Sequence, residues 1–204
     1  MNLPNKITIG RVVMVGILII LLGLPYQALN IPIPILFGDI NLIYLIGVII
    51  FLIASFSDFL DGYIARKYNL VTNFGKFMDP VADKVLIDAA LIFLMIRPLW
   101  AAPTQITVAP IIVIIFIARD LIVDAMRLVA SSRKIVVAAN IFGKLKTVAQ
   151  MMAVTFVFLN DFPFSYLNLP AFLTITDFLL YIAAALSITS GVIYIYQNRK
   201  VFHD

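Results

Sequence analysis

The sequence contains no cysteine and no glutamate, and it has a single histidine. Without cysteine the chain can form no disulfide, no thiolate metal site and no cysteine nucleophile. The one histidine, His203, is the next-to-last residue, which argues against a zinc site built from several imidazoles. All 11 acidic residues are aspartates, so hard cations that prefer oxygen ligands are the metals that remain open.

Charged residues are also scarce. They make up 13% of the 204 residues, against 63% hydrophobic residues, and the mean hydropathy is +1.06. A chain this short cannot bury such an apolar excess in one soluble core. The composition therefore excludes soluble globular, disordered and collagen-like classes and indicates an integral membrane protein. The net charge of +4 is typical of the positive-inside bias of such proteins, and no nucleic-acid partner is expected.

Six apolar stretches predict an all-α integral membrane protein, a bundle of six transmembrane helices, because each is near the roughly 20 residues that cross a bilayer. They cover residues 8–28, 42–66, 77–96, 106–130, 137–159 and 172–197. No repeat or low-complexity tract divides the chain, so we expect one domain over residues 1–204. A cleavable signal peptide is not expected, since the first stretch is too long and lacks a small-residue cleavage site.

The basic residues fall mostly on one side of this six-span zigzag. The side that holds both termini carries Lys6, Arg11, Arg66, Lys67, Lys76, Arg127, Arg133, Lys134, Arg199 and Lys200. The other side has only Arg97. By the positive-inside rule we expect a multi-pass protein of the plasma membrane with both termini in the cytoplasm.

Charged residues inside the predicted spans gather at the cytoplasmic ends of four helices. They lie in the segments SDFLDGYIARK, GKFMDPVADK, ARDLIVDAMR and GKLKT. Charges inside a membrane are costly, so they pair with one another or line wet cavities, and they mark function. Four charged helix ends at one depth predict a shared polar cavity that opens to the cytoplasm.

Four aspartates form the most informative group. Asp58 and Asp61 share one broad face of the second predicted helix, and Asp79 and Asp83 are one turn apart on the third. Because four close carboxylates repel one another, divalent cations with all-oxygen ligation, Mg²⁺ or Mn²⁺, are the natural resolution. A solvated helix cap or an ion pair would explain one aspartate pair more easily than two pairs in register. A cation transporter is the alternative from another functional class, but transporters commonly show inverted repeats that this sequence lacks.

Small residues and an arginine accompany these carboxylates. Gly62 and Gly75 have no side chain where a ligand would approach a helix backbone, and Arg66 offers a guanidinium fork for a phosphate. Together the spacing is Asp58-x2-Asp61-Gly62-x2-Ala65-Arg66-x8-Gly75-x3-Asp79-x3-Asp83. This pattern resembles, at all eight fixed positions, the signature of the CDP-alcohol phosphotransferase family. The opening NLPNKIT…R and the six-span plan are similar to the bacterial phosphatidylglycerophosphate synthases of that family.

The resemblance implies a role for each signature residue. Asp58, Asp61, Asp79 and Asp83 would hold two Mg²⁺ or Mn²⁺ ions at the diphosphate of a CDP-linked donor, with Asp83 also the general base for the acceptor hydroxyl. Residues implied in binding the CDP part of the donor are Gly62, Ala65, Arg66, Thr72 and Gly75. Thr72, which precedes a predicted helix, is also typical of an ordinary N-cap.

A cationic cluster on the fourth and fifth predicted helices favours an acceptor that already carries a phosphate. Arg119 and Arg127 lie about 80° apart around one helix, and Lys144 and Lys146 join them from the next. Arginine forks and lysine point charges suit phosphate. Two alternatives stay open. Asp120 or Asp124 could neutralise the arginines, and Arg11 could either reach the cavity as a further phosphate ligand or anchor at the headgroups.

The expected function is transfer of the phosphatidyl group from CDP-diacylglycerol to glycerol 3-phosphate, giving phosphatidylglycerophosphate and CMP. Within the same family, inositol phosphate or phosphatidylglycerol, the latter as in cardiolipin synthases, is the alternative acceptor. The lipid bilayer is a further expected partner, and the resemblance implies a homodimer.

Overall fold

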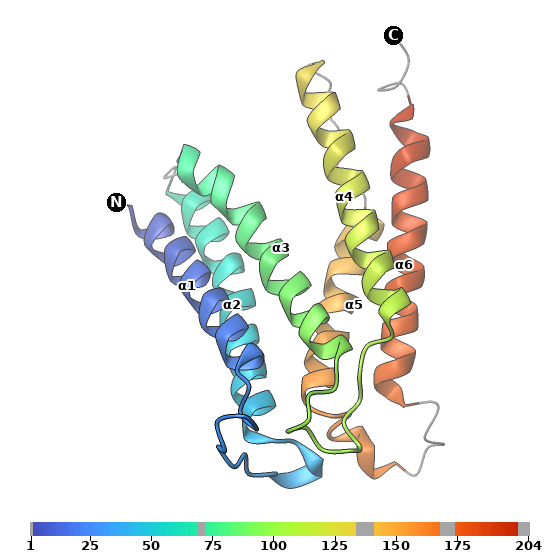
Figure 1. Ribbon diagram of the computed structural model, residues 1–204. Helices are drawn as coiled ribbons and strands as arrows, with labels where there is room; N and C mark the ends of the chain where they lie inside the picture. Colours follow the sequence, from blue (N-terminus) through green and yellow to red (C-terminus); the bar gives the residue numbers. More distant parts are fainter. Residues whose placement is uncertain (1, 69–71, 134–140, 168–173, 200–204) are drawn as a thin grey trace. The chain divides into compact units, whose positions relative to one another are not determined.

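The computed structural model describes residues 2–68, 72–133, 141–167 and 174–199. Within these ranges it is helical, with no β-strand beyond a single bridge between Ile35 and Asn41. The long helices are α1 (Leu3–Gly23), α2 (Leu42–Lys67), α3 (Asn73–Met95), α4 (Pro110–Ser132), α5 (Ile141–Phe158) and α6 (Ile175–Gln197) (Figure 1). Two short 3₁₀ turns, η1 (Phe37–Asp39) and η2 (Phe164–Tyr166), lie in the connections. The predicted all-helical class is confirmed.

Side-chain caps and prolines determine where these helices begin. The Asn41 side chain accepts a hydrogen bond from the Tyr44 amide at the start of α2, and Thr174 forms a capping box with Asp177 at the start of α6. Proline occupies the first turn of α1 and of α4, where its missing N–H costs no hydrogen bond. These caps satisfy backbone groups that have no partner inside the helix.

The first and third helices begin earlier than predicted. The first was expected over residues 8–28 but runs over Leu3–Gly23, because Pro4 starts it and Pro25 follows its end. The third begins at Asn73 rather than residue 77, since Thr72 caps it. The beginnings of the fifth and sixth predicted spans, together with Lys134, Lys200 and His203, lie outside the described residues.

Four of the described helices are long and apolar enough to cross a membrane: α1, α2, α5 and α6. Helices α3 and α4 have sufficient length but carry more charged residues, among them Asp79 and Asp83 in α3 and Arg119 and Asp120 in α4. The chain is thus a multi-pass membrane protein, as predicted. The count of six spans stays a prediction, because hydropathy cannot separate a buried polar span from a helix outside the bilayer.

The chain forms two compact units, and the first contains Met1–Thr107 and Thr155–Pro163. In it α1 packs against both α2 and α3 (Figure 1). Leu18, Phe51 and Leu91 supply fully buried side chains from these three helices. Trp100 lies against Tyr44, with their ring centroids 5.1 Å apart. This packing holds α1 against the two helices that carry the predicted metal ligands.

The second unit contains Val108–Val154 and Phe164–Asp204, so it includes α4, most of α5, and α6. Its α4 packs against α6. Val123 and Met126 of α4 form a buried cluster with Tyr194 of α6. Small side chains, Ala183, Ala184 and Gly191, line the buried face of α6 and allow close approach of a neighbouring helix.

Candidate functional site

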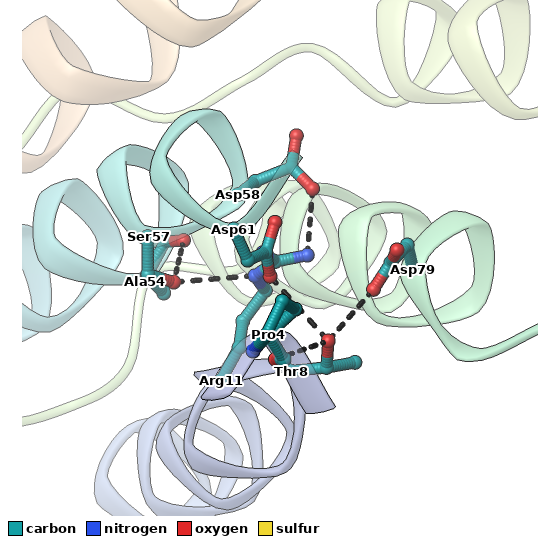
Figure 2. A network of polar contacts seen from close by, with 8 residues as sticks. All are labelled: Pro4, Thr8, Arg11, Ala54, Ser57, Asp58, Asp61 and Asp79. Atoms are coloured by element: carbon teal, nitrogen blue, oxygen red, sulfur yellow. Dashed lines mark hydrogen bonds and ion pairs between the residues drawn. The ribbon is translucent and has the colours of Figure 1, made fainter. Parts of the chain in front are cut away.

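The predicted metal ligands lie on helices α2 and α3 of the first unit, and α1 contacts three of them. Asp58 and Asp61 belong to the last turns of α2, whereas Asp79 and Asp83 follow each other by one turn on α3. The Asp61 side chain is 3% exposed and that of Asp58 is 43% exposed. Figure 2 shows side chains of α1 reaching Asp58, Asp61 and Asp79.

Arg11 of α1 holds the two carboxylates of α2 together. Its Nη1 donates to Asp58 Oδ1 at 2.7 Å and its Nη2 donates to Asp61 Oδ2 at 2.5 Å. Its Nε donates to Ser57 Oγ at 3.2 Å, and the side chain is fully buried. A buried guanidinium requires such partners because an unpaired charge in an apolar interior is very costly. Arg11 thus reaches the carboxylate cluster, while its role as a phosphate ligand stays a prediction.

Thr8, one turn before Arg11, connects the two carboxylate-bearing helices. Its hydroxyl donates to Asp79 Oδ1 at 2.9 Å, and Asp61 Oδ2 lies 3.4 Å from the same hydroxyl oxygen. The side chain is buried, and the carbonyl oxygen of Pro4 is also within 3.2 Å. A single neutral hydroxyl therefore stands between a carboxylate of α2 and one of α3 (Figure 2).

The donor set suits a hard divalent cation. Three carboxylates of two helices join one hydrogen-bonded network, and all of its acceptors are oxygens, which Mg²⁺ and Mn²⁺ prefer. Within the described residues, however, no three carboxylates already surround one point at ligating distance. In Figure 2 the Arg11 guanidinium bonds both Asp58 and Asp61, and the Thr8 hydroxyl lies between Asp61 and Asp79.

Thr72 caps α3 and ties it to α1. Its Oγ1 accepts from the Gly75 amide at 3.0 Å and donates to Asn5 Oδ1 at 2.7 Å. A Cβ at Gly75 would lie 3.4 Å from Thr72 Oγ1 and 3.6 Å from both Asn5 Oδ1 and Asp79 Oδ2. The missing side chain thus leaves space beside the Asp79 carboxylate. The predicted N-cap role of Thr72 is confirmed.

The other residues predicted to bind the donor lie on α2. Gly62 and Ala65 are half-buried, in the last turns of that helix. Arg66 also belongs to α2, but the structure does not describe its side chain. Asp83, the predicted general base, is half-buried on α3.

The second unit brings together two of the predicted phosphate ligands. Asp120 Oδ1 accepts from Arg119 Nη1 at 2.9 Å, and its Oδ2 accepts from Lys146 Nζ at 2.7 Å. Arg119 Nη2 also donates to Ser190 Oγ of α6. Of the predicted alternative, the pairing of Asp120 with Arg119 is confirmed. One carboxylate faces two cations, however, so this trio keeps a net charge of +1.

Two glycines leave room for the Arg119 side chain, and one of its N–H groups can still donate a hydrogen bond. A Cβ at Gly143 would lie 3.3 Å from Arg119 Nη2, and one at Gly191 would lie 3.2 Å from Arg119 Cγ. Its Nε is buried and has no hydrogen-bond partner among the described residues. A cavity of about 230 Å³ between α4 and α6 is lined by Arg119 and by apolar side chains. This guanidinium is therefore held in place while one donor stays available.

The remaining predicted phosphate ligands are placed differently. Arg127 is exposed, and its Nε donates to the Tyr194 hydroxyl at 3.1 Å. Lys144 is exposed on α5, two residues before the buried Lys146. Because residues two apart on a helix point about 200° apart, Lys144 and Lys146 do not share a face.

Several contact residues escaped the sequence analysis, among them Thr8 and Ser190. Thr8 lies inside the predicted first span but was not singled out, because a threonine in an apolar helix gives no sign that its partners are aspartates of other helices. Ser190 was missed because small hydroxyl residues in an apolar helix, here Ser187, Thr189 and Ser190, are common and give no sign of a charged partner. In both cases the partner lies on another helix, and the sequence contains no local signal for it.

Comparison with known proteins adds evidence independent of this geometry. A family model described as CDP-alcohol phosphatidyltransferase matches residues 1–189. A Bacillus subtilis protein called CDP-diacylglycerol--glycerol-3-phosphate 3-phosphatidyltransferase is 42% identical over 97% of this chain and 95% of its own length. A protein of the same name from Mycoplasma genitalium is 37% identical, over 100% of this chain and 87% of its own length.

Replacing Thr8 with valine is expected to destabilise the metal-free protein. Thr8→Val keeps the side-chain shape but removes the hydroxyl donor to Asp79, and a lost hydrogen bond to a charged group costs roughly 1.5–3 kcal/mol. The midpoint of thermal unfolding in detergent, measured with a chelator present, should fall. Thr8→Ser keeps the hydroxyl and is the control. Equal midpoints for the two variants would show that the hydroxyl bridge contributes no stability.

Proposed function

Because the chain belongs to the CDP-alcohol phosphatidyltransferase family, we propose that it transfers the phosphatidyl group of CDP-diacylglycerol to glycerol 3-phosphate. The products are phosphatidylglycerophosphate and CMP. The observation that carries this proposal is the match, over nearly the whole chain, to relatives named for that reaction. The polar networks on α1–α3 and on α4–α6 support it, because the first offers carboxylates and the second offers cations.

We assign Asp58, Asp61, Asp79 and Asp83 as ligands of two Mg²⁺ or Mn²⁺ ions. Their support is the all-oxygen donor set and the network that already gathers three of the four aspartates. When bound, such ions would neutralise charge on the donor diphosphate and on the departing CMP. Arg11 and Thr8 of α1 contact three of these carboxylates, those of Asp58, Asp61 and Asp79.

Asp83 is the proposed general base. It would take the proton from the acceptor hydroxyl as the oxygen of that hydroxyl bonds to the phosphorus of the phosphatidyl group. The bond from that phosphorus to the bridging diphosphate oxygen breaks, and CMP leaves with the electron pair. Such a base is effective only when it is positioned at the reacting proton, and its place on α3, whose start is capped by Thr72, supports this positioning.

The donor would lie along the carboxyl-terminal part of α2 and the beginning of α3. We assign its CDP part to Gly62, Ala65, Arg66, Thr72 and Gly75. The space that Gly75 leaves beside the Asp79 carboxylate supports this assignment. Thr72 has its hydroxyl engaged in capping α3 and in the bond to Asn5, so its contribution would be to hold the helix start in place.

The acceptor phosphate would bind to a set of cations, Arg119, Arg127, Lys144 and Lys146, with Arg11 as a further ligand. The best support is at Arg119 and Lys146, which keep a net positive charge around Asp120. The Nε of Arg119, which has no partner in the part of the chain that the structure describes, is a donor that a phosphate oxygen would satisfy. Arg11 would have to leave Asp58 and Asp61 to reach a phosphate, because all three of its nitrogens are engaged.

The membrane arrangement is also a proposal. We propose six spans in the plasma membrane, cytoplasmic termini and a polar cavity open to the cytoplasm, based on the asymmetry of the basic residues. The helices that contain the charged residues, α3 and α4, would then be shielded from lipid by the apolar ones. We also propose a homodimer with one active site in each subunit.

The test of the function is an acceptor comparison. Purified protein with CDP-diacylglycerol and Mg²⁺ or Mn²⁺ should release CMP when glycerol 3-phosphate is added, and more slowly with inositol phosphate or phosphatidylglycerol. Removal of the metal with a chelator should stop the release, and its return should restore it. If another acceptor gives the fastest release, the chain catalyses a different reaction of the same family.

Asp83→Asn should lower turnover by roughly 10²–10⁴-fold, the usual contribution of a positioned general base. Binding of CDP-diacylglycerol should persist, because three aspartates remain to hold a metal. Steady-state CMP release and a separate donor-binding measurement give the two quantities. Asp88→Asn, the same change further along α3, is the control and should keep most of the activity. Equal losses in the two variants would remove the argument for Asp83 as the base.

Arg119→Ala should raise the KM for glycerol 3-phosphate by about ten- to a hundredfold, the effect of losing one charge-assisted contact. The KM for CDP-diacylglycerol should stay near its original value, since the lost contact concerns the acceptor alone. Arg133→Ala removes the same charge from the end of the same helix and is the control. An unchanged acceptor KM would show that Arg119 serves only its ion pair with Asp120.

A further inference from the structure

Gln150 of α5 has a buried side-chain amide whose two polar atoms need partners. It is 1% exposed, and neither Oε1 nor Nε2 has a hydrogen-bond partner among the described residues. Ser187 of α6 is also fully buried, and its Oγ lacks a partner in the same part of the chain. Buried polar groups are nearly always satisfied, because leaving one unpaired costs as much as a lost hydrogen bond. Both residues therefore require an explanation that packing does not supply.

Their positions connect them to the cationic trio of the second unit. Gln150 follows Lys146 by four residues on α5, and Ser187 precedes Ser190 by three on α6. Residues three or four apart on a helix are neighbours on one face, with Cβ atoms about 5–6 Å apart. Lys146 contacts Asp120, and Ser190 accepts from Arg119. The unpartnered amide and hydroxyl are thus each one turn from a residue of the network around Arg119.

This combination has the chemistry that a small phosphorylated polyol needs. The cations, with the Nε of Arg119 that has no partner among the described residues, suit the phosphate. An amide offers both a donor and an acceptor, and a serine hydroxyl offers the same, so each can bond an alcohol group in either direction. We propose that Gln150 and Ser187 bind the secondary hydroxyl of glycerol 3-phosphate, the one that does not react, and thereby select this acceptor. The inference rests on the proposed function and adds two residues that would determine the specificity for the acceptor.

Selection of this kind has a clear physical basis. A site whose buried polar groups are satisfied only by the substrate hydroxyl rejects an analogue that lacks the hydroxyl, because those groups then stay unpaired. The analogue that isolates this contact is 3-hydroxypropyl phosphate. It keeps the phosphate and the reacting primary hydroxyl of glycerol 3-phosphate but has no secondary hydroxyl.

The experiment measures kcat/KM for CMP release with both acceptors in the full-length protein. Wild type should prefer glycerol 3-phosphate over 3-hydroxypropyl phosphate by about tenfold or more. Gln150→Met, which keeps the length of the side chain but removes both hydrogen-bonding atoms, should lower the value for glycerol 3-phosphate by about tenfold. It should leave the value for 3-hydroxypropyl phosphate nearly unchanged, so the preference disappears. Arg119→Ala is the matched comparison and should lower both values by the same factor.

If Gln150→Met lowers kcat/KM equally for both acceptors, or for neither, the proposed role of Gln150 is overturned. The amide would then serve packing or bond a buried water. If that variant does not fold, Ser187→Ala decides, and it should reduce the preference severalfold. A wild-type preference that survives in Ser187→Ala then overturns the proposal. No CMP release from wild type with glycerol 3-phosphate would instead contradict the proposed function, so the two failures are distinguishable.

Discussion

The ion pairs of Arg11 with Asp58 and Asp61 are the interaction on which the first unit depends. Several carboxylates inside a bundle of apolar helices repel one another, and each loses hydration when it is buried. Arg11 offsets both effects because it is itself fully buried and reaches two carboxylates at once. Since the guanidinium comes from α1, the position of that helix against α2 is tied to the carboxylate cluster. Thr8 extends the same link to Asp79 on α3.

In the second unit the cations are in excess, and a carboxylate lies between them. There one carboxylate, Asp120, stands between Arg119 and Lys146, so the network keeps a positive charge, whereas the network around Arg11 keeps a negative one. An excess of carboxylates favours divalent cations and an excess of cations favours phosphate. The two networks are thereby suited to the two kinds of ligand that a phosphatidyl transfer needs, a metal-bound diphosphate and a phosphorylated alcohol.

Local structure and site geometry are coupled at the beginning of α3. Thr72 satisfies the Gly75 amide, and the hydrogen bond from its hydroxyl to Asn5 attaches the same helix start to α1. Asp79 follows Gly75 by one turn, so its carboxylate lies where the glycine leaves space. The cap that stabilises the helix start therefore also helps to place Asp79, a predicted metal ligand. For this reason Thr72 is compatible both with capping and with a role at the binding site.

The sequence by itself determined the all-helical membrane class, the family and the helices that carry the aspartates, because composition, hydrophobic length and motif spacing are properties of the chain alone. Only the tertiary structure decided how the charges pair. Arg11 and Asp58 are 47 residues apart in the chain, and no periodic pattern indicates that they meet. For the same reason Thr8 and Ser190 were missed, and the competition of Asp120 for Arg119 and Lys146 could only be posed as an alternative. Pairing depends on which helix faces which, and that is determined by packing of apolar surfaces which look alike in sequence.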